Sequence, residues 1–126
     1  MTLLGLQQEF AWHAGRLLLR AAEMGYAVTL GDAARSLEEQ RRLIAAGLSH
    51  VKDPATGAHV RRLAVDLNLF HGGHWLKASE DHEALAAWWR DQHELARWGG
   101  VWSDGNHYSF EWRGVRGGRS LSDPRC

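Results

Sequence analysis

The segment 63–70 constrains the fold more than any other, because its apolar side chains recur with a period of two. Such alternation predicts a β-strand with one face toward a hydrophobic core. The core face would be formed by Leu63, Val65, Leu67 and Leu69. The other face carries Asp66 in the middle of the strand, where a carboxylate is costly unless it is hydrated, paired or bound to a cation. Asp66 is therefore the first candidate functional residue.

Three segments show apolar residues at helical spacing and predict α-helices. They cover residues 2–25, 36–47 and 79–98. The second is the clearest, because Ser36 and Glu39 have the spacing of a capping box and a glycine follows the last turn. A core strand and amphipathic helices together predict a fold in which helices cover one face of a sheet.

Shorter strands are predicted at 26–30, 101–102 and 107–112, with a loop at 48–58 and a turn at 71–75. No glycine-rich phosphate loop follows a strand, which argues against a doubly wound α/β fold. We therefore expect an α+β fold with a small antiparallel sheet packed against helices. The length of 126 residues predicts a single domain, 1–126, with a flexible tail at 117–126.

Charge and cysteine content exclude several classes of function. Lys+Arg and Asp+Glu both number 15, so there is no basic excess to bind nucleic acid or an anionic membrane. The single cysteine, Cys126, cannot form an internal disulfide. We see no signal peptide and no apolar run long enough for a membrane span. These features predict a monomer made in the reducing cytoplasm that inserts into no membrane.

Two short patterns could supply metal ligands. His59 lies seven residues before Asp66, and Asp104 and His107 have the spacing Asp-x-x-His beside a turn. Two imidazoles and one carboxylate leave a fourth tetrahedral position open, as in catalytic rather than structural zinc sites. From the residues alone an ion pair or a solvated Asp66 remains an alternative. The rival histidines are His50, His71 and His74 in loops, and His13, His82 and His93 in predicted helices.

Four separated elements together resemble one family. They are AARSLEEQRRLIAAGLS, His59 with Asp66 within RLAVDL, the segment WGGVW, and Asp104-x-x-His107. The chain resembles the zinc D-Ala-D-Ala carboxypeptidase and L-alanyl-D-glutamate peptidase family, which has the hedgehog/DD-peptidase fold and includes many phage endolysins. The resemblance covers residues 29–111.

The resemblance implies a role for each matching residue. His59, Asp66 and His107 would hold Zn²⁺, Asp104 would be the catalytic carboxylate, and Arg35 would lie near the substrate. Two positions depart from the family pattern: Gly57 stands where serine is common, and Arg62 where glycine is common. Neither is a metal ligand, so the departures concern only the substrate side of the site.

The expected function is therefore a zinc-dependent peptidase that cuts peptidoglycan stem peptides at the L-Ala–D-Glu bond, as phage or prophage lysins do. Such a protein would accumulate in the cytoplasm until it is released to the cell wall, and tryptophan-rich segments could line its cleft. Two alternatives remain open. One is a D-Ala-D-Ala carboxypeptidase or dipeptidase that acts on soluble precursors. The other is a catalytically inactive, zinc-stabilised module that binds the wall.

Overall fold

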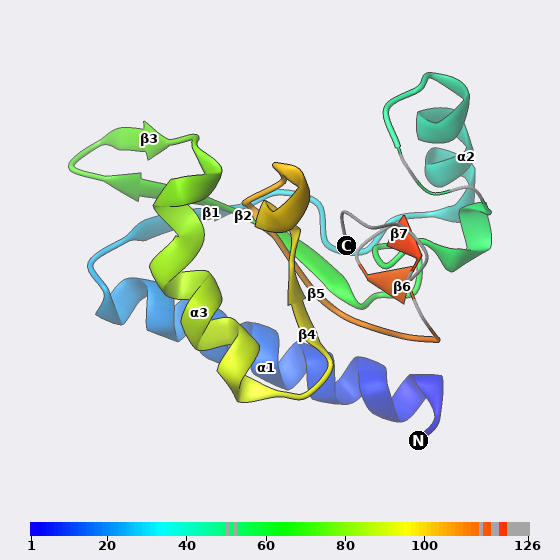
Figure 1. The fold of residues 1–126 in the computed structure, drawn as a ribbon, viewed down its shortest axis with the longest axis horizontal. Coiled ribbons are helices and arrows are strands. Elements are labelled where there is room, and N and C mark those ends of the chain that lie inside the picture. The colour runs from blue at the N-terminus through cyan, green and yellow to red at the C-terminus, as the bar shows by residue number, and fades with distance from the viewer. Residues whose placement is uncertain (50, 52, 114, 117–118, 121–126) are drawn as a thin grey trace.

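The computed structural model describes residues 1–49, 51, 53–113, 115–116 and 119–120 (Figure 1). The expected α+β class is confirmed, because helices pack against a small antiparallel sheet. The helices are α1 (Leu3–Glu23), α2 (Leu37–Ala45) and α3 (Glu83–Gln92), and the short 3₁₀ helices are η1 (Pro54–Thr56), η2 (Ser79–His82) and η3 (Gly99–Trp102). The strands are β1 (Ala27–Leu30), β2 (Ala64–His71), β3 (His74–Leu76), β4 (Ala96–Trp98), β5 (His107–Phe110), β6 (Val115–Arg116) and β7 (Arg119–Ser120).

The main sheet has the order β1-β2-β5-β4, and every pairing in it is antiparallel. β2 is the central strand: its first half pairs with β5, and its second half pairs with both β1 and β3. The predicted core face is confirmed, since the side chain of Leu63, just before β2, and those of Val65, Leu67 and Leu69 within it are 0–6% exposed. The core also includes side chains from α1 and α3. The described part of the chain contains no helix that is long and apolar enough to cross a membrane.

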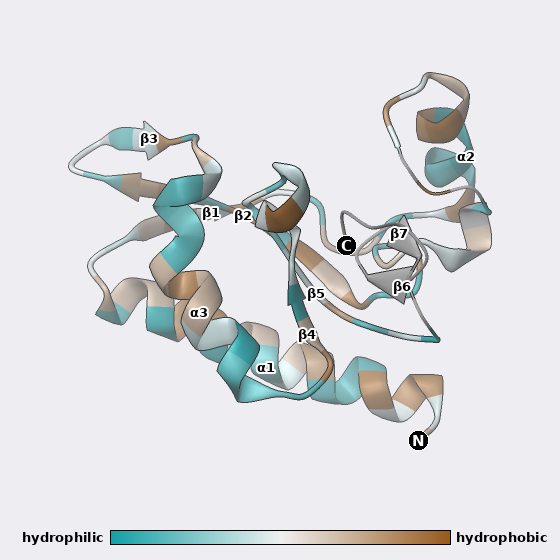
Figure 2. Ribbon diagram, viewed as in Figure 1, coloured by the Kyte–Doolittle hydropathy of each residue, from teal (hydrophilic) through white to brown (hydrophobic). Residues whose placement is uncertain are grey.

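Helix α1 follows its sequence pattern closely. Thr2 caps its first turn by accepting a hydrogen bond from the Gly5 N–H at 3.0 Å. The residues buried along it are Leu6, Phe10, Leu17 and Ala21. Apolar and polar residues alternate along the ribbon of α1 in Figure 2, as expected for a helix with one buried stripe. α1 therefore forms one side of the core.

Helix α2 differs from its prediction in which side chain it buries. Ser36 caps it as expected, by accepting a hydrogen bond from the Glu39 N–H. Its predicted apolar stripe is only partly buried, and Leu37 is 38% exposed. The one buried side chain of α2 is the polar Gln40. This helix lies at the opposite end of the molecule from β3 (Figure 1). It therefore packs against the loops around it rather than against the main core.

The predicted helix over 79–98 is wrong after Gln92. α3 ends at Gln92, and His93 leaves it with an extended backbone. The His93 ring Nδ1 accepts a hydrogen bond from the Leu95 N–H at 3.0 Å, which stabilises the turn. Ala96–Trp98 then forms β4 and pairs with β5. Because this pairing buries Ala96 and Trp98 in the core, tertiary contacts override the helical spacing.

The predicted strand at 101–102 is also wrong, because these residues belong to η3. A side chain at Gly100 would collide with the Trp98 indole, which packs over this glycine and donates to the Gly105 carbonyl at 2.7 Å. The turn at 71–75 is a hairpin instead, in which Gly72 and Gly73 have φ of +56° and +80°. Two consecutive positive φ values suit the tight connection between β2 and β3.

The strand boundaries differ slightly from those predicted: β2 is shifted by one residue, and β5 ends at Phe110 instead of 112. In the segment 117–126, Arg119–Ser120 forms β7 and pairs with β6. The remainder of that predicted tail lies outside the described residues.

Candidate metal and catalytic site

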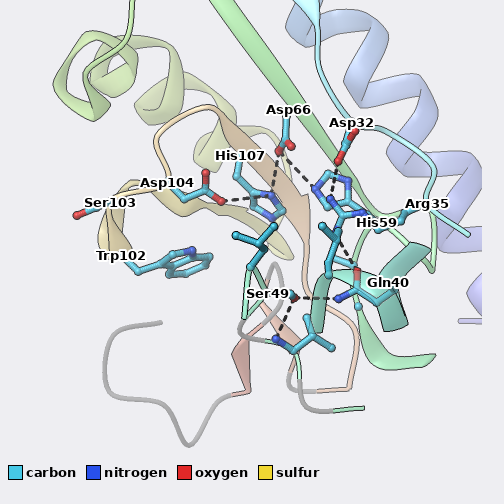
Figure 3. A pocket seen from close by; sticks show the side chains of 15 residues that line it. Asp32, Arg35, Gln40, Ser49, His59, Asp66, Trp102, Ser103, Asp104 and His107 are labelled. Atoms are coloured by element: carbon cyan, nitrogen blue, oxygen red, sulfur yellow. Dashed lines mark hydrogen bonds and ion pairs between the residues drawn. The ribbon is translucent and has the colours of Figure 1, made fainter. Parts of the chain in front are cut away.

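Three side chains from three parts of the chain meet at one point beside the sheet (Figure 3). His59 lies in the turn before β2, Asp66 is in β2, and His107 begins β5. Asp66 and His107 are direct cross-strand partners, so the register of β2 and β5 places them on the same face. One potential ligand atom from each residue lies within 4.8 Å of the other two. The structure thus brings together the residues predicted to hold a metal.

The three side chains share one carboxylate oxygen as their centre. Asp66 Oδ1 lies 3.2 Å from His107 Nδ1 and 3.4 Å from His59 Nε2. The two imidazole rings are 5.1 Å apart between centroids and nearly perpendicular. Both rings are buried, whereas Asp66 is partly open to the pocket described below. Two imidazole nitrogens and a carboxylate oxygen around one point form a donor set that suits Zn²⁺.

The orientation of His59 gives a test of whether a metal fits. Its Nδ1 lies 2.9 Å from the Ala33 carbonyl oxygen and can only donate a proton to it. Nε2 is therefore the nitrogen that His59 presents to the cluster, where it lies toward Asp66 and can bind a cation when it is deprotonated. Such a carbonyl contact is typical of metal-binding histidines. His107 Nε2 is buried and has no hydrogen-bond partner among the described residues, so only its Nδ1 takes part in the cluster.

Electrostatics at Asp66 favour its ionised form. Burial by itself raises the pKa of this carboxyl group, but hydrogen bonds with His107 and His59 outweigh it and leave the pKa well below its ordinary value. The site therefore presents a carboxylate at neutral pH. A negatively charged carboxylate oxygen between two imidazoles is well placed to bind a cation.

The backbone around Asp66 is fixed on both sides. The Gly31 N–H donates to the Asp66 carbonyl, and the Asp66 N–H donates to the Asp32 carbonyl, both at 2.8 Å. A side chain at Gly31 would come within 3.1 Å of Asp66 Cβ, so the glycine allows the chain after β1 to lie close beside the ligand. These bonds extend the ladder of β1 and hold the carboxylate in a rigid part of the sheet.

Asp104 lies beside the cluster on the turn between η3 and β5. Its Oδ2 is 3.9 Å from His107 Nδ1, and its side chain is 47% exposed. The turn is tight: the Asp104 N–H donates to the Gly99 carbonyl at 2.9 Å, and a side chain at Gly99 would come within 2.8 Å of His107 Cβ. Ser103 has a φ of +65° in the same turn. Asp104 can thus reach both the cluster and the solvent of the pocket.

Arg35 lines the same pocket and is held by two neighbours. Its Nη1 donates to Gln40 Oε1 at 2.8 Å, and its Nη2 donates to Asp32 Oδ2 at 2.7 Å. Gln40 in turn donates from Nε2 to Ser49 Oγ at 2.8 Å. The Arg35 N–H also donates to the His59 carbonyl at 3.1 Å, which ties the arginine to a predicted ligand. Hydrogen bonds from both Nη atoms therefore hold the guanidinium group in place before any substrate binds.

Sequence reasoning gave Gln40 no role beyond its place in a motif, and it missed Asp32 and Ser49. Gln40 could have been recognised from the sequence, because it is a polar residue on a helix face that was predicted to be apolar. Asp32 and Ser49 carried no comparable signal, because both lie in stretches that resemble ordinary turns. Their contribution depends on how the loops beside α2 fold, since Asp32 bonds to Arg35 and Ser49 bonds to Gln40.

The site opens into a pocket of about 410 Å³. One part of its lining is polar and includes the cluster, Asp104 and Arg35, and the other part is apolar. The apolar lining residues are Leu43, Leu48, Val51, Gly57, Ala58 and Trp102. Trp102 is the tryptophan of the pocket, whereas Trp89 is fully buried in the core, as expected from its place on a predicted helix. A pocket of this size can hold a short peptide segment.

The rival histidines lie elsewhere. His71 and His74 are exposed partners at the end of the β2–β3 hairpin. His82 is buried, and its Nδ1 lies 2.7 Å from the Tyr108 hydroxyl. The ring of His13 on α1 packs edge-on against His93 at the end of α3, and His93 stacks on Phe110. His50 lies outside the described residues.

The two departures from the family pattern have different local environments. Arg62 has a φ of +59° in the turn before β2, a backbone conformation in which glycine is less strained. Its side chain is exposed and does not line the pocket. A side chain at Gly57 would contact the Gln40 amide at 3.4 Å, an ordinary distance, so this position could accommodate a small residue.

Comparisons with known proteins support the fold. A scan against protein-family models and a search of curated proteins found no match. Among solved structures, the chain is similar to the L-Ala D-Glu endopeptidase ChiX of Serratia marcescens, with 23% identity and a TM-score of 0.62. The similarity covers 78% of this chain and 77% of that chain. The protein therefore shares the fold of a solved endopeptidase.

Proposed function

We propose that the protein is a zinc-dependent peptidase that hydrolyses the L-Ala–D-Glu bond of peptidoglycan stem peptides, as a phage or prophage lysin. One observation carries the proposal: His59, Asp66 and His107 converge in a pocket that also contains Asp104 and Arg35. The fold shared with an L-Ala D-Glu endopeptidase supports the same substrate class. The three converging residues would hold the metal, and the open side of the cluster faces the substrate.

When bound, Zn²⁺ would supply Lewis acidity that lowers the pKa of water and polarises a carbonyl group. The residues must then orient the substrate and move protons. Asp104 is suited to proton transfer, because its carboxylate is near the cluster and partly exposed to the pocket. It would accept a proton from the attacking water and deliver it to the amine that leaves.

Arg35 would bind the peptide on the other side of the cluster. Its side chain is 14% exposed and oriented by Gln40 and Asp32, so little entropy is lost when it engages a ligand. A guanidinium can donate to a carboxylate or to the oxygen on which negative charge develops. D-Glu in the stem peptide carries a free carboxyl group next to the proposed scissile bond, which matches this cation.

The proposal is tested by incubating the purified protein with cell walls and with a D-Ala-D-Ala dipeptide, and identifying the new amine termini by mass spectrometry. New N-terminal D-Glu is expected from the wall. Release of D-Ala alone would instead indicate the carboxypeptidase or dipeptidase alternative. A protein that binds one zinc per chain and the wall, yet cleaves neither substrate, would be the inactive binding module.

Metal dependence needs its own measurement. Dialysis against a chelator should abolish hydrolysis, and adding Zn²⁺ should restore it. Hydrolysis that continues at the same rate after complete removal of metal, verified by elemental analysis, would contradict the proposal.

A further inference from the structure

The face of β2 that carries Asp66 continues beyond the pocket as an exposed surface. Asn68 and Phe70 follow Asp66 on this face, because alternate residues of a strand point to the same side. Thr29 of β1 lies opposite Asn68, and the Asn68 side-chain amide donates to Thr29 Oγ1 at 3.2 Å in an exposed hydrogen bond. Trp75 of β3 lies opposite Phe70.

Trp75 is notable among these residues because it is 52% exposed. The Lys77 ammonium group lies over its ring, 5.1 Å from the centroid. The surface thus has a polar part next to the cluster and an aromatic ring with a cation at its far end. We call Thr29, Asn68, Phe70, Trp75 and Lys77 the strand surface. An exposed indole beside polar groups can stack on the ring of a ligand.

The strand surface and Arg35 lie on opposite sides of the cluster. β1 runs antiparallel to β2, so the chain after Asp32 continues past the N-terminal end of β2, and Arg35 lies there. Trp75 pairs with the C-terminal half of β2. Figure 1 shows this separation, with β3 and α2 at opposite ends of the molecule. A substrate whose carboxylate is held by Arg35 would therefore extend from the cluster toward Trp75 at its amino side.

The chemistry of the substrate determines what lies on that side. In peptidoglycan, the amino group of L-Ala is joined through a lactyl group to an N-acetylated sugar of the glycan strand. The alanine and the lactyl group together span about two residue lengths, roughly 7 Å. From Asp66 to Phe70 the strand advances about 13 Å at roughly 3.3 Å per residue. The first sugars therefore fall on the strand surface.

We propose that the strand surface binds the glycan chain attached to the stem peptide, with Trp75 stacking on a sugar ring. The amide of Asn68 and the hydroxyl of Thr29 can exchange hydrogen bonds with sugar hydroxyl or acetamido groups. The inference rests on the proposed function, and it adds that the enzyme recognises the wall polymer and not only the peptide. It also gives the catalytic domain a wall-binding surface of its own.

The test compares two substrates that differ only in the sugar: a stem peptide with a free L-Ala amine, and the same peptide joined to a disaccharide. Trp75→Ala should lower kcat/KM for the sugar-linked peptide by about tenfold and change the free peptide by less than about twofold. Trp75→Tyr should restore most of the loss. Trp12→Ala is the matched control, because Trp12 is 64% exposed on α1, which packs against the other face of the sheet.

Equal loss on both substrates, or no loss on the sugar-linked one, overturns the inference while leaving the proposed function intact. Failure of the wild-type protein to cleave either substrate contradicts the proposed function instead. A second measurement does not depend on catalysis: a peptide-free glycan fragment should shift the indole N–H resonance of Trp75 and leave that of Trp12 unchanged. An unshifted Trp75 resonance at saturating fragment also overturns the inference.

Discussion

Two regions of this protein each combine two histidines, one carboxylate, one arginine and one glutamine, and they differ in what those side chains contact. The site group consists of His59, His107, Asp66, Arg35 and Gln40. The helix group consists of His13, His93, Glu9, Arg16 and Gln92, contributed by α1, α3 and the residue that ends α3. In each group an arginine donates to a glutamine, at 2.8 Å in the site group and 2.9 Å in the helix group.

The difference lies in how the imidazole nitrogens are used. In the helix group, His93 Nε2 lies 2.9 Å from Glu9 Oε2, and its Nδ1 accepts a hydrogen bond from the Leu95 N–H. Both nitrogens of His93 therefore make contacts that stabilise the fold. In the site group, His59 uses only Nδ1 for the backbone and turns Nε2 toward Asp66. The site group also faces a pocket. Residue types alone therefore do not make a metal site; imidazole nitrogens that converge on a carboxylate beside an open pocket do.

The largest contrast is expected from one histidine of each group. His59→Gln should reduce bound zinc to well below one per chain and lower hydrolysis by about 10³-fold or more, because the metal supplies several kcal/mol of transition-state stabilisation. His93→Gln should leave both unchanged. Elemental analysis and wall hydrolysis measure the two effects. If His93→Gln lost zinc and His59→Gln kept it, the assignment of the two groups would be reversed.

A smaller contrast is expected from the carboxylates. Asp104→Asn should lower kcat by about 10²- to 10⁴-fold, the usual value of proton transfer by a placed side chain. Bound zinc should remain, since Asp104 is not one of the three converging residues. Glu9→Gln should leave kcat unchanged. Steady-state kinetics with elemental analysis on the same samples makes the comparison, and full activity of Asp104→Asn would remove this residue from the mechanism.

The two glutamines give a third contrast. Gln40→Leu leaves Arg35 Nη1 and Ser49 Oγ without their partner, so kcat/KM should fall by about tenfold, the value of one hydrogen bond. Gln40→Glu keeps an acceptor for Arg35 and should recover most of that loss. Gln92→Leu breaks the corresponding bond with Arg16 and should not affect kinetics. Identical kinetics of Gln40→Leu and the wild type would show that Arg35 needs no such support.

The smallest effect concerns pH and the helix group. Burial, followed by the charges of His93 and Arg16, lowers the pKa of His13 from its ordinary 6.5, and Glu9 opposes this shift. The unfolded chain therefore takes up a proton below pH 6.5 that the folded chain resists, so stability is full above that pH and declines as the pH falls. His13→Gln should reduce this decline, so that Tm falls less between neutral and acid pH than in the wild type. Thermal unfolding of the zinc-loaded protein over the acid range measures it, and an unchanged decline would exclude His13 as its source.

Sequence patterns predicted those parts of the molecule in which one local rule dominates. The alternation around Asp66 identified the central strand, and the cap at Thr2 identified the start of α1. The pattern failed at 93–102, because the helical spacing of α3 continued into residues that instead pair with β5. The 3₁₀ helix that follows depends on close packing at Gly99 and Gly100, which no periodicity reports.

The residues of the candidate site also fall into those that the sequence predicted and those that it did not. Spacing and resemblance pointed to His59, Asp66, His107, Asp104 and Arg35, and the structure brings all five to one pocket. The supporting roles of Asp32 and Ser49 could not be predicted, because a spacing of three or nine residues next to a loop does not determine which side chains form hydrogen bonds. The strand surface was missed for a related reason. Its tryptophan, Trp75, lies in a segment that was interpreted as a turn.

The placement of the three candidate ligands on the backbone affects the order in which the molecule becomes rigid. Asp66 and His107 are already opposite each other on hydrogen-bonded strands, whereas His59 belongs to a turn. An ion bound by all three would act as a tether that removes conformational freedom mainly from the turn and from Arg35, whose N–H is bonded to the His59 carbonyl. Cation uptake would therefore slow amide exchange at that edge of the cleft far more than within the sheet.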